Sequence, residues 1–274
     1  MEFPQARQRF YSETRQPNEE INLAKASLYI AQEDYPDLDV DEYLNILDAM
    51  AAELSDRLPA ERYPMRTIQA INSYLYEDLG FFGNTTNYYD PRNSFLHQVI
   101  DRRTGIPITL SLIYLEVAKR IDFPMVGIGM PGHFIIRPNF EDSGIFVDAF
   151  NKGEILFPED CQERIRRIFN RDVPLRPEFL EAIDNRGFLA RMLGNLKMIY
   201  LQRGQAKRCL AAIERILLLF PDAPLELRDR GLLYYQSQRW NLARPDLEAY
   251  LDRVPHASDA HLIRQILDRI NQNN

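Results

Sequence analysis

Cysteine and histidine are scarce in this chain, and their scarcity excludes several kinds of site. The 274 residues include two cysteines, Cys161 and Cys209, and four histidines, none with the spacing of a metal-binding motif. We therefore expect no metal and no cofactor. Two isolated thiols do not make a disulfide scaffold and are typical of a reducing compartment, so we expect a cytoplasmic protein.

Long apolar runs are also missing. No stretch of about eighteen apolar residues occurs, so no membrane span is expected. The first residues, Met1-Glu2-Phe3-Pro4, are not followed by a basic segment and an apolar core, so no signal peptide is expected either. With 45% hydrophobic residues, the chain can form the core of one large domain or two ordinary ones.

Positive charge is short in the front of the chain. Residues 183–274 carry 14 basic and 10 acidic side chains, which leaves 19 of the 33 basic and 30 of the 40 acidic residues to 1–182. An acidic front part repels a phosphate backbone, so we expect no nucleic acid partner. A protein, a peptide or a small solute is the expected partner.

Apolar residues at helical spacing dominate the first ninety residues. One stripe follows Asn18, a second follows Asp41 as the predicted N-cap, and a third ends at Gly80, which suits a left-handed C-terminal conformation. Their members are Ile21, Ala24 and Leu28; Tyr43, Ile46, Leu47, Met50 and Leu54; and Ile68, Ile71, Leu75 and Leu79. These stripes predict three amphipathic helices.

The middle of the chain predicts a small α+β core. Gly105-Ile106-Pro107 stands just before an apolar periodic run that ends at Ile121, which is typical of a helix start. Segments rich in β-branched and aromatic residues follow, with turns at Pro131-Gly132 and over Asn139 to Ser143. The strand segments are 125–129, 133–137, 145–150 and 154–157. Because they are consecutive, we expect an antiparallel sheet.

His133 and Asp148 are the candidate site residues on these strands. A histidine on one strand and an aspartate on its neighbour form the base and the orienting group of a nucleophilic triad. His133 is equally open to two other interpretations, a ligand-binding side chain or a core histidine bonded to Asp148. Val147 and two apolar residues flank Asp148, so we expect it to be partly buried and to need a partner.

The nucleophile of such a site is not evident. Thr109 and Ser111 lie near a helix start, where the helix dipole favours an anion, but a hydroxyl there more commonly caps or packs. Cys161 follows the strands in a loop-like stretch and is not on the core helix. These three side chains remain open as nucleophiles.

Other charged residues near the core helix have ordinary alternatives. Arg102 and Arg103 suggest a clamp for a carboxylate or phosphate, or else surface solvation and an internal ion pair. Glu116 falls outside the apolar face of its helix. We therefore expect Glu116 to face solvent or a partner.

The tail repeats with a period of 34 residues. Equivalent pairs are Leu193 and Leu227, Tyr200 and Tyr234, Ile213 and Leu247, and Pro221 and Pro255. This period is the tetratricopeptide signature, in which each repeat is a helical hairpin. Gly231 and Ala243 occupy its small-residue positions, where the first repeat has Lys197 and Cys209. A capping helix with Leu262, Ile266 and Ile270 is expected to close the array, and a generic helical bundle is the alternative.

Four segments together resemble one family: Arg102 to Ser111, Tyr114 to Ala118, Pro131 to Phe134, and Asp148 to Asn151. They are similar to the SirB-type family of bacterial proteins, which have a transglutaminase-like core followed by tetratricopeptide repeats. The resemblance extends over nearly the whole chain. It implies a transglutaminase-like domain over 1–180, with helices in 1–90 and the core in 91–160, and repeats over 184–274.

The wider transglutaminase-like fold implies a cysteine at the start of the core helix, a histidine on a strand and an aspartate on the next. His133 and Asp148 match the last two, whereas the cysteine position falls at about Pro107. The resemblance thus implies a protein without the cysteine nucleophile, whose His–Asp cleft binds a peptide or side chain while the repeats hold a second protein. The alternatives are an amide hydrolase or acyltransferase that uses Thr109 or Ser111, and a regulatory scaffold with a vestigial cleft.

Overall fold

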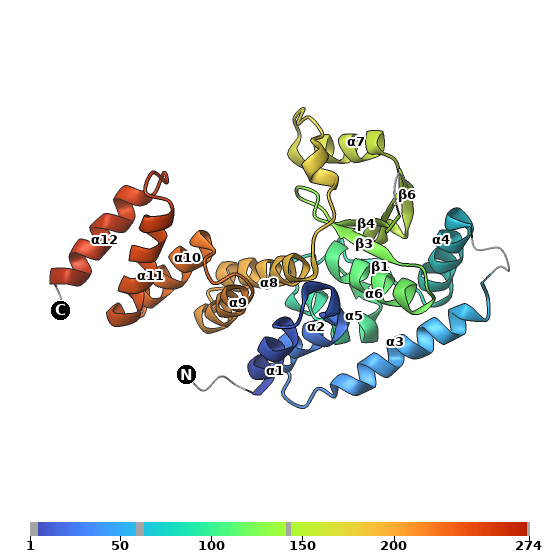
Figure 1. Ribbon diagram of the computed structural model, residues 1–274, viewed down its shortest axis with the longest axis horizontal. Coiled ribbons are helices and arrows are strands. Elements are labelled where there is room, and N and C mark those ends of the chain that lie inside the picture. Colours follow the sequence, from blue (N-terminus) through green and yellow to red (C-terminus); the bar gives the residue numbers. More distant parts are fainter. Residues whose placement is uncertain (1–4, 59–62, 141–143, 273–274) are drawn as a thin grey trace. The chain divides into compact units, whose positions relative to one another are not determined.

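The structure is a computed structural model that describes residues 5–58, 63–140 and 144–272 (Figure 1). It divides into two compact units, Met1–Met192 and Leu193–Asn274. The division falls inside α8 (Asn185–Gln202), a helix that starts one residue after the predicted beginning of the repeats. In the described parts of the chain, no helix combines the length and the apolarity that crossing a membrane requires.

The first unit opens with helices. Their bounds are α1 (Gln5–Thr14), α2 (Leu23–Gln32), α3 (Val40–Ser55), α4 (Pro64–Asn72) and α5 (Leu96–Arg102). The three predicted amphipathic helices correspond to α2, α3 and α4. The last of these continues as a π-helical turn, Ser73–Asp78, before the chain turns at Gly80 with a positive φ of 70°.

Two predicted helix starts were wrong by a few residues. The Asn22 side chain caps α2 by accepting a hydrogen bond from the Lys25 amide at 2.9 Å, and Asn18 lies in a separate 3₁₀ turn. Asp39 caps α3, because its carboxylate reaches the amide of Asp41 at 3.0 Å. Several polar residues precede each helix, and only the chain's path decides which of their oxygens reaches the free amides.

The core helix is α6 (Pro107–Arg120), and every residue from 107 to 118 is buried. A helix that is covered on all sides lies inside a domain. The expectation for Glu116 was therefore wrong: it is 6% exposed and pairs with Arg120, which also donates to Asp48 at 2.6 Å. Helix α3 packs along α6, and its Asp48 is the residue that Arg120 reaches.

A four-stranded antiparallel sheet packs against α6, as predicted. Its strands, in spatial order, are β3 (Met125–Ile128), β4 (Ile135–Pro138), β5 (Phe146–Asp148) and β6 (Glu154–Leu156). Residues 141–143 of the predicted polar turn lie outside the described residues. A short parallel pair, β1 (Phe82–Gly83) with β2 (Thr104–Gly105), lies at the start of α6.

Helix α7 (Pro158–Phe169) was not predicted, because its sequence carries few apolar residues. Pro158 opens it, and the Asp160 carboxylate accepts a hydrogen bond from the Phe157 amide at 2.9 Å. Cys161 and Ile165 are its buried residues, one turn apart, and they join a small core under the sheet. The expectation of a loop around Cys161 was therefore wrong.

The second unit consists of the later turns of α8 with α9 (Ala206–Leu219), α10 (Pro224–Gln236), α11 (Trp240–Arg253) and α12 (Ala260–Gln272). Helices α9 and α11 begin and end 34 residues apart, which confirms the repeat. Tyr200 in the first repeat and Tyr234 in the second are both buried, with 3% and 7% of their surface exposed. A Cβ at Gly231 would lie 2.7 Å from the Leu247 side chain, so the small residue is needed there.

Helix α12 closes the array, with one correction to its buried face. Ile263, Ile266 and Ile270 are buried, whereas Leu262 is 54% exposed. Ile266 and Ile270 of the predicted stripe are therefore confirmed, and Ile263 takes the place of Leu262. Ile263 and Leu262 are both apolar, so the sequence did not distinguish them.

Candidate functional site

Asp148 and His133 lie in direct contact. Asp148 ends β5, its side chain is completely buried, and its Oδ2 lies 2.7 Å from Nε2 of His133. His133 stands two residues before β4, in the turn that follows β3, and not on the strand itself. Because β4 pairs with β5 in antiparallel register, the start of β4 and the end of β5 meet at one edge of the sheet.

The Asp148 carboxylate has five hydrogen-bond donors. Its Oδ1 accepts from the amides of Phe150 at 3.0 Å and Asn151 at 3.2 Å. Its Oδ2 accepts from the Asn151 side chain at 2.9 Å and from Arg164 of α7 at 2.6 Å, in addition to His133. Burial alone would raise the pKa of Asp148, but its contact with His133, the hydrogen bond from Asn151 and the charge of Arg164 lower it overall. Asp148 is thus held as an anion.

This contact determines the tautomer of His133. An ionised carboxylate accepts hydrogen bonds only, so the ring hydrogen of the neutral imidazole lies on Nε2. Nδ1 is then a hydrogen-bond acceptor, and none of the described residues donates to it. The His133 side chain is 10% exposed. In its neutral form, His133 therefore offers one accepting nitrogen to an incoming group.

Aromatic rings lie on one side of His133. The Phe150 ring is edge-on to the imidazole with 6.2 Å between centroids, and Tyr88 contacts Phe150 at 6.1 Å. Gly83 allows this arrangement, because a Cβ there would lie 2.6 Å from the Phe150 ring. Tyr89 stacks edge-on with Tyr88 and is 58% exposed.

The two candidate hydroxyls at the start of α6 are both fully buried. The Thr109 hydroxyl donates to the Asn93 carbonyl at 2.7 Å and accepts from the Ile106 amide at 3.1 Å, so it closes the helix start. Ser111 Oγ is buried, and no residue in the described ranges forms a hydrogen bond with it. Neither hydroxyl bonds to His133 within the described structure.

Both thiols are buried as well. Cys161 lies on α7, where burial above all, and nearby acidic groups, raise its pKa to about 12. Burial likewise raises the pKa of Cys209, whose Sγ lies 3.7 Å from the Lys197 carbonyl oxygen in the second unit. A thiol in such surroundings stays protonated at neutral pH.

The two arginines before α6 serve the local structure. Arg102 donates to the Asn93 side chain at 3.3 Å, and the Arg103 guanidinium lies 4.8 Å from the centroid of the Phe81 ring. Arg103 has a left-handed backbone with φ of 55°, which ends α5. No ion pair joins either arginine to an acidic residue within the described structure.

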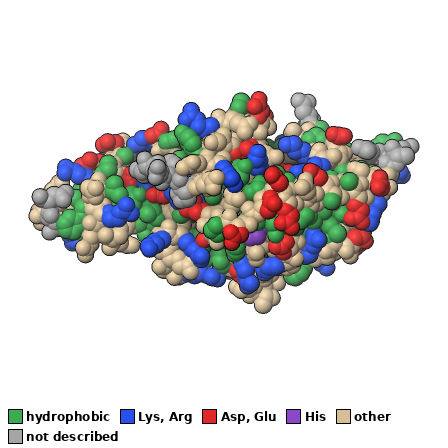
Figure 2. All heavy atoms as spheres, turned by 90° about the horizontal axis from the view of Figure 1, so that it is seen from below, with side chains coloured by type: hydrophobic (Ala, Val, Ile, Leu, Met, Phe, Trp, Pro, Cys, Tyr) green, Lys and Arg blue, Asp and Glu red, His purple; other side chains and the backbone are tan. Residues whose placement is uncertain are grey.

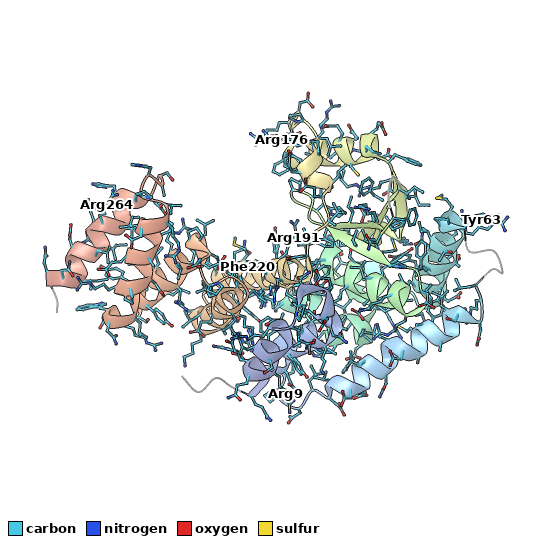
Figure 3. All side chains as sticks on the ribbon, viewed as in Figure 1. Arg9, Tyr63, Arg176, Arg191, Phe220 and Arg264 are labelled. Atoms are coloured by element: carbon cyan, nitrogen blue, oxygen red, sulfur yellow. The ribbon has the colours of Figure 1, made fainter. Side chains whose placement is uncertain are left out.

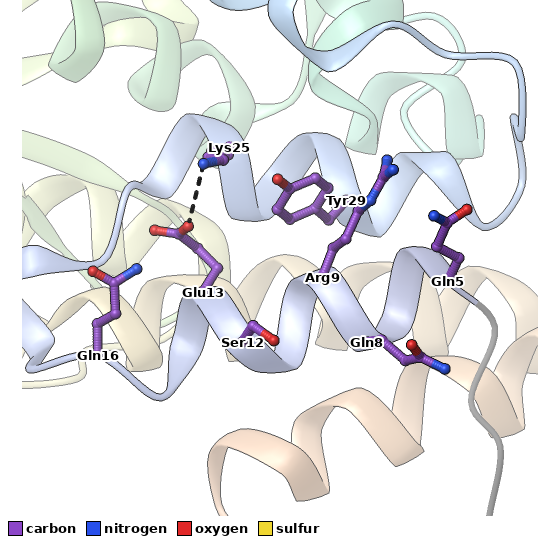
Figure 4. A pocket seen from close by; sticks show the side chains of 8 residues that line it. All are labelled: Gln5, Gln8, Arg9, Ser12, Glu13, Gln16, Lys25 and Tyr29. Carbon is purple, nitrogen blue, oxygen red and sulfur yellow. Dashed lines mark ion pairs between the residues drawn. The ribbon is translucent and has the colours of Figure 1, made fainter.

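Two hollows occur elsewhere in the first unit. One, of about 400 Å³, lies between α1 and α2, where Lys25 and Glu13 approach to 3.9 Å (Figure 4). The other, of about 280 Å³, lies beside the outer strand β3 and includes Glu116 and Phe188. Neither includes His133 or Asp148 in its lining.

Sequence reasoning did not find Arg164 as a partner of Asp148. Nothing in its local sequence distinguishes it from the neighbouring Arg166 and Arg167. Only the helical phase of α7 and its place beside β6 point Arg164 at the buried carboxylate, where it also bonds Glu154 at 2.6 Å. Asn151 stands within the recognised segment that begins at Asp148.

Comparison with known proteins agrees with this architecture. Residues 41–194 match the transglutaminase-like superfamily, and residues 196–268 match the tetratricopeptide repeat. Such repeats indicate protein partners. No solved structure matches the chain.

Three relatives illustrate the range. A "UPF0162 protein" of Xylella fastidiosa (strain 9a5c) is 37% identical over 251 residues, covering 90% of this chain and 89% of the relative. A "UPF0162 protein" of Vibrio cholerae is 31% identical over 214 residues, with 78% of each chain covered. Human "F-box only protein 21" is 31% identical over 186 residues, covering 64% of this chain and 29% of that protein. The chain therefore belongs to the UPF0162 family of proteins, with a transglutaminase-like domain followed by tetratricopeptide repeats.

Proposed function

We propose that the first unit is a binding module for a peptide or an exposed side chain, and that the repeats hold a second protein. The observation that carries this proposal is the bonding of Asp148. In a catalytic triad the carboxylate stabilises the imidazolium that forms during the reaction. Here Arg164 already neutralises that carboxylate, which leaves less of its charge to stabilise a protonated His133.

The candidate nucleophiles support the same conclusion. Thr109 closes the start of α6, Ser111 is buried, and both thiols are buried with raised pKa values. A nucleophile needs hydrogen-bond reach to its base, and none of these groups bonds to His133. The free, buried thiols also favour a reducing compartment such as the cytoplasm.

The ligand contact that we propose is a hydrogen bond to Nδ1 of His133. As an acceptor, Nδ1 takes an N–H or O–H donor such as a peptide amide. The Phe150 and Tyr88 rings beside it provide apolar contact, and Tyr89 extends this surface to solvent. Human F-box only protein 21 contains the matching region as a minor part of its length, as expected of a module used in more than one context.

The repeats are the proposed site for a protein partner, because helical hairpins in series present extended surfaces for segments of other proteins. Acidic and basic side chains are interspersed on the face drawn in Figure 2. Such a mixed surface favours a protein over a polyanion as partner, and we propose that nucleic acid is not bound.

An array of immobilised peptides, probed with the full chain, tests this proposal. We expect a subset of sequences to bind, and His133→Ala to weaken that binding at least tenfold, which corresponds to about 1.4 kcal/mol. His261→Ala, at an exposed position in α12, is the control and should leave binding unchanged. Binding that is equally strong in both variants would exclude the His133 contact.

An amide hydrolase or acyltransferase is the second candidate. It is favoured by Ser111 Oγ, a buried hydroxyl that no described residue engages. The test is a glutamine- and peptide-amide turnover assay of the wild type, Thr109→Ala and Ser111→Ala. We expect no turnover; activity that either substitution abolishes would replace the binding proposal with this one.

A further inference from the structure

Arg191, labelled in Figure 3, lies in the part of α8 that belongs to the first unit and contacts the turn that carries His133. Its guanidinium donates to the carbonyl oxygens of Gly129 at 3.2 Å, Met130 at 2.8 Å and His133 at 2.6 Å. It also lies 5.6 Å from the centroid of the Phe134 ring. One side chain thus binds three carbonyls within five residues.

The partners of Arg191 are unusual for a partly buried cation. Burial lowers its pKa, and no carboxylate pairs with it among the described residues. Its charge is compensated by carbonyl dipoles instead. A planar guanidinium fixes several acceptors in one geometry, which a lysine ammonium does not do.

The turn itself is built around Gly132. Gly132 has a positive φ of 73°, and a Cβ there would lie 2.6 Å from Ile168 of α7. The main internal hydrogen bond of the turn joins the His133 amide to the Met130 carbonyl at 3.1 Å. Arg191 donates to the same Met130 carbonyl and also to the carbonyl of His133. Its contacts therefore lie on both sides of the His133 amide.

We propose that Arg191 is the positioning residue of His133, and that it holds the turn so that Nε2 meets Asp148 and Nδ1 faces the ligand. This inference deepens the proposed function and rests on it for the role of Nδ1. Because α8 continues past Met192 into the second unit, the helix that begins the repeats also sets the orientation of His133.

Nitrogen-15 NMR of the full chain labelled at histidine tests the inference without any ligand. With four histidines, each ring gives separable Nδ1 and Nε2 signals, and these report the tautomer. For the wild type we expect His133 to show the Nε2–H form. Arg191→Met should move His133 toward a mixture of the two tautomers, and Arg191→Lys should give an intermediate result.

Arg186→Met is the matched control. Arg186 lies on the same helix and also donates to backbone carbonyls, those of Thr14 and Gln16, but it does not contact the His133 turn. We expect it to leave the His133 signals as in the wild type. Arg191→Lys keeps the charge and most of the volume, so the comparison stands even if Arg191→Met does not fold.

Two results would overturn the inference: unchanged His133 signals in the folded Arg191 variants, or an equal change in Arg186→Met. The experiment measures the tautomer of the His133 ring and needs no ligand. It therefore remains informative if the peptide array shows no binding, in which case the proposed function fails while the positioning role of Arg191 stands.

Discussion

At the scale of residues, the charge of Asp148 is the feature on which the site depends. Two amides, an asparagine, an arginine and His133 converge on one fully buried carboxylate. A buried ion costs free energy unless such partners surround it. The sequence predicted His133 as a partner, whereas Arg164 required the packing of α7.

Replacement of Asp148 by asparagine keeps the shape of the side chain and removes its charge. We expect the free energy of unfolding to fall by about 3 kcal/mol, because Arg164 is then left without its buried partner. Urea denaturation at neutral pH measures this. Glu154→Gln is the control: Glu154 pairs with the same arginine, but its side chain is 49% exposed, so we expect a loss below about 1 kcal/mol.

The difference in stability between the wild type and Asp148→Asn is predicted to depend on pH. The pKa of Asp148 is lowered in the folded state, so its charge stabilises the fold above the unfolded-state pKa, about 3.9. That stability is lost as the pH falls from this value through the lower folded-state pKa. The deficit of Asp148→Asn should therefore be complete above about pH 4 and should shrink under more acidic conditions. A deficit that grows with acid would contradict the assigned charge.

His97 is predicted to set the stability between neutral and mildly acidic pH. It is 3% exposed, neither ring nitrogen has a hydrogen-bond partner among the described residues, and Tyr35 and Tyr43 pack edge-on against it with centroids 4.5 and 5.7 Å away. Burial lowers its pKa from 6.5, although Asp101, which accepts a hydrogen bond from Tyr43, opposes this. The neutral ring is favoured, so this stability is present above pH 6.5 and is lost as the pH falls below it.

We expect the wild type to lose up to about 1.4 kcal/mol per pH unit in this window. His97→Phe should remove most of that dependence, since phenylalanine cannot be protonated. His261→Gln, at an exposed position, should retain it. Denaturation curves between pH 5 and about pH 7 compare the three proteins. Equal slopes in all of them would assign the dependence to another group.

At the scale of elements, two turns form the site, and a distant side chain restrains each. Arg191 holds the turn of His133, and Asn72 of α4 donates to the Gly153 carbonyl at 2.8 Å in the turn after Asp148. Tyr114 of α6 donates in turn to Asn72 at 3.1 Å. Both restraints join segments that are far apart in the sequence.

A substitution of Gly153 by alanine tests the second restraint. Gly153 has φ of 72°, and its Cβ would lie 2.0 Å from Asn72 Oδ1. Gly80→Ala is the matched control, because Gly80 has φ of 70° and a Cβ added there would meet no neighbouring atom within 4 Å. We expect about 1 kcal/mol of destabilisation in Gly80→Ala from backbone strain, and clearly more in Gly153→Ala. Equal losses would show that the Asn72 contact yields without cost.

At the scale of the whole molecule, the chain consists of two compact units joined by a continuous helix. Each unit has its own buried charge cluster. In the second, Lys197 is 8% exposed and lies 2.8 Å from Glu226 and 2.6 Å from Asp229. This cluster joins α8 to α10, and Lys197 stands at the position that Gly231 occupies in the second repeat.

Calorimetry of variants in each cluster tests whether the units unfold separately. We expect Lys197→Met to destabilise the repeats by about 3 kcal/mol, because two carboxylates lose their shared cation. Lys197→Met should lower the midpoint temperature of one thermal transition, and Asp148→Asn should lower that of the other. Arg244→Met, in an exposed ion pair with Glu248, is the control and should cost under about 0.5 kcal/mol. A single transition shifted by both variants would show one cooperative unit.

The sequence by itself determined the fold class, the antiparallel sheet and the 34-residue repeat. Each of these features leaves a pattern that can be read along the chain. The patterns are helical or alternating apolar spacing, turn residues, and residues that recur at a fixed interval. It also placed His133 and Asp148 together, because adjacent antiparallel strands bring their ends to one edge.

Only the tertiary structure decided which side chains complete the site. Glu116 is buried with its partner Arg120, which Asp48 of α3 also engages, and the phase of α7 brings Arg164 to Asp148. Arg191 reaches its three carbonyls across about sixty residues of sequence. Such contacts leave no local pattern in the sequence. The residues that flank an arginine do not reveal whether its guanidinium bonds a buried carbonyl or carboxylate or faces water.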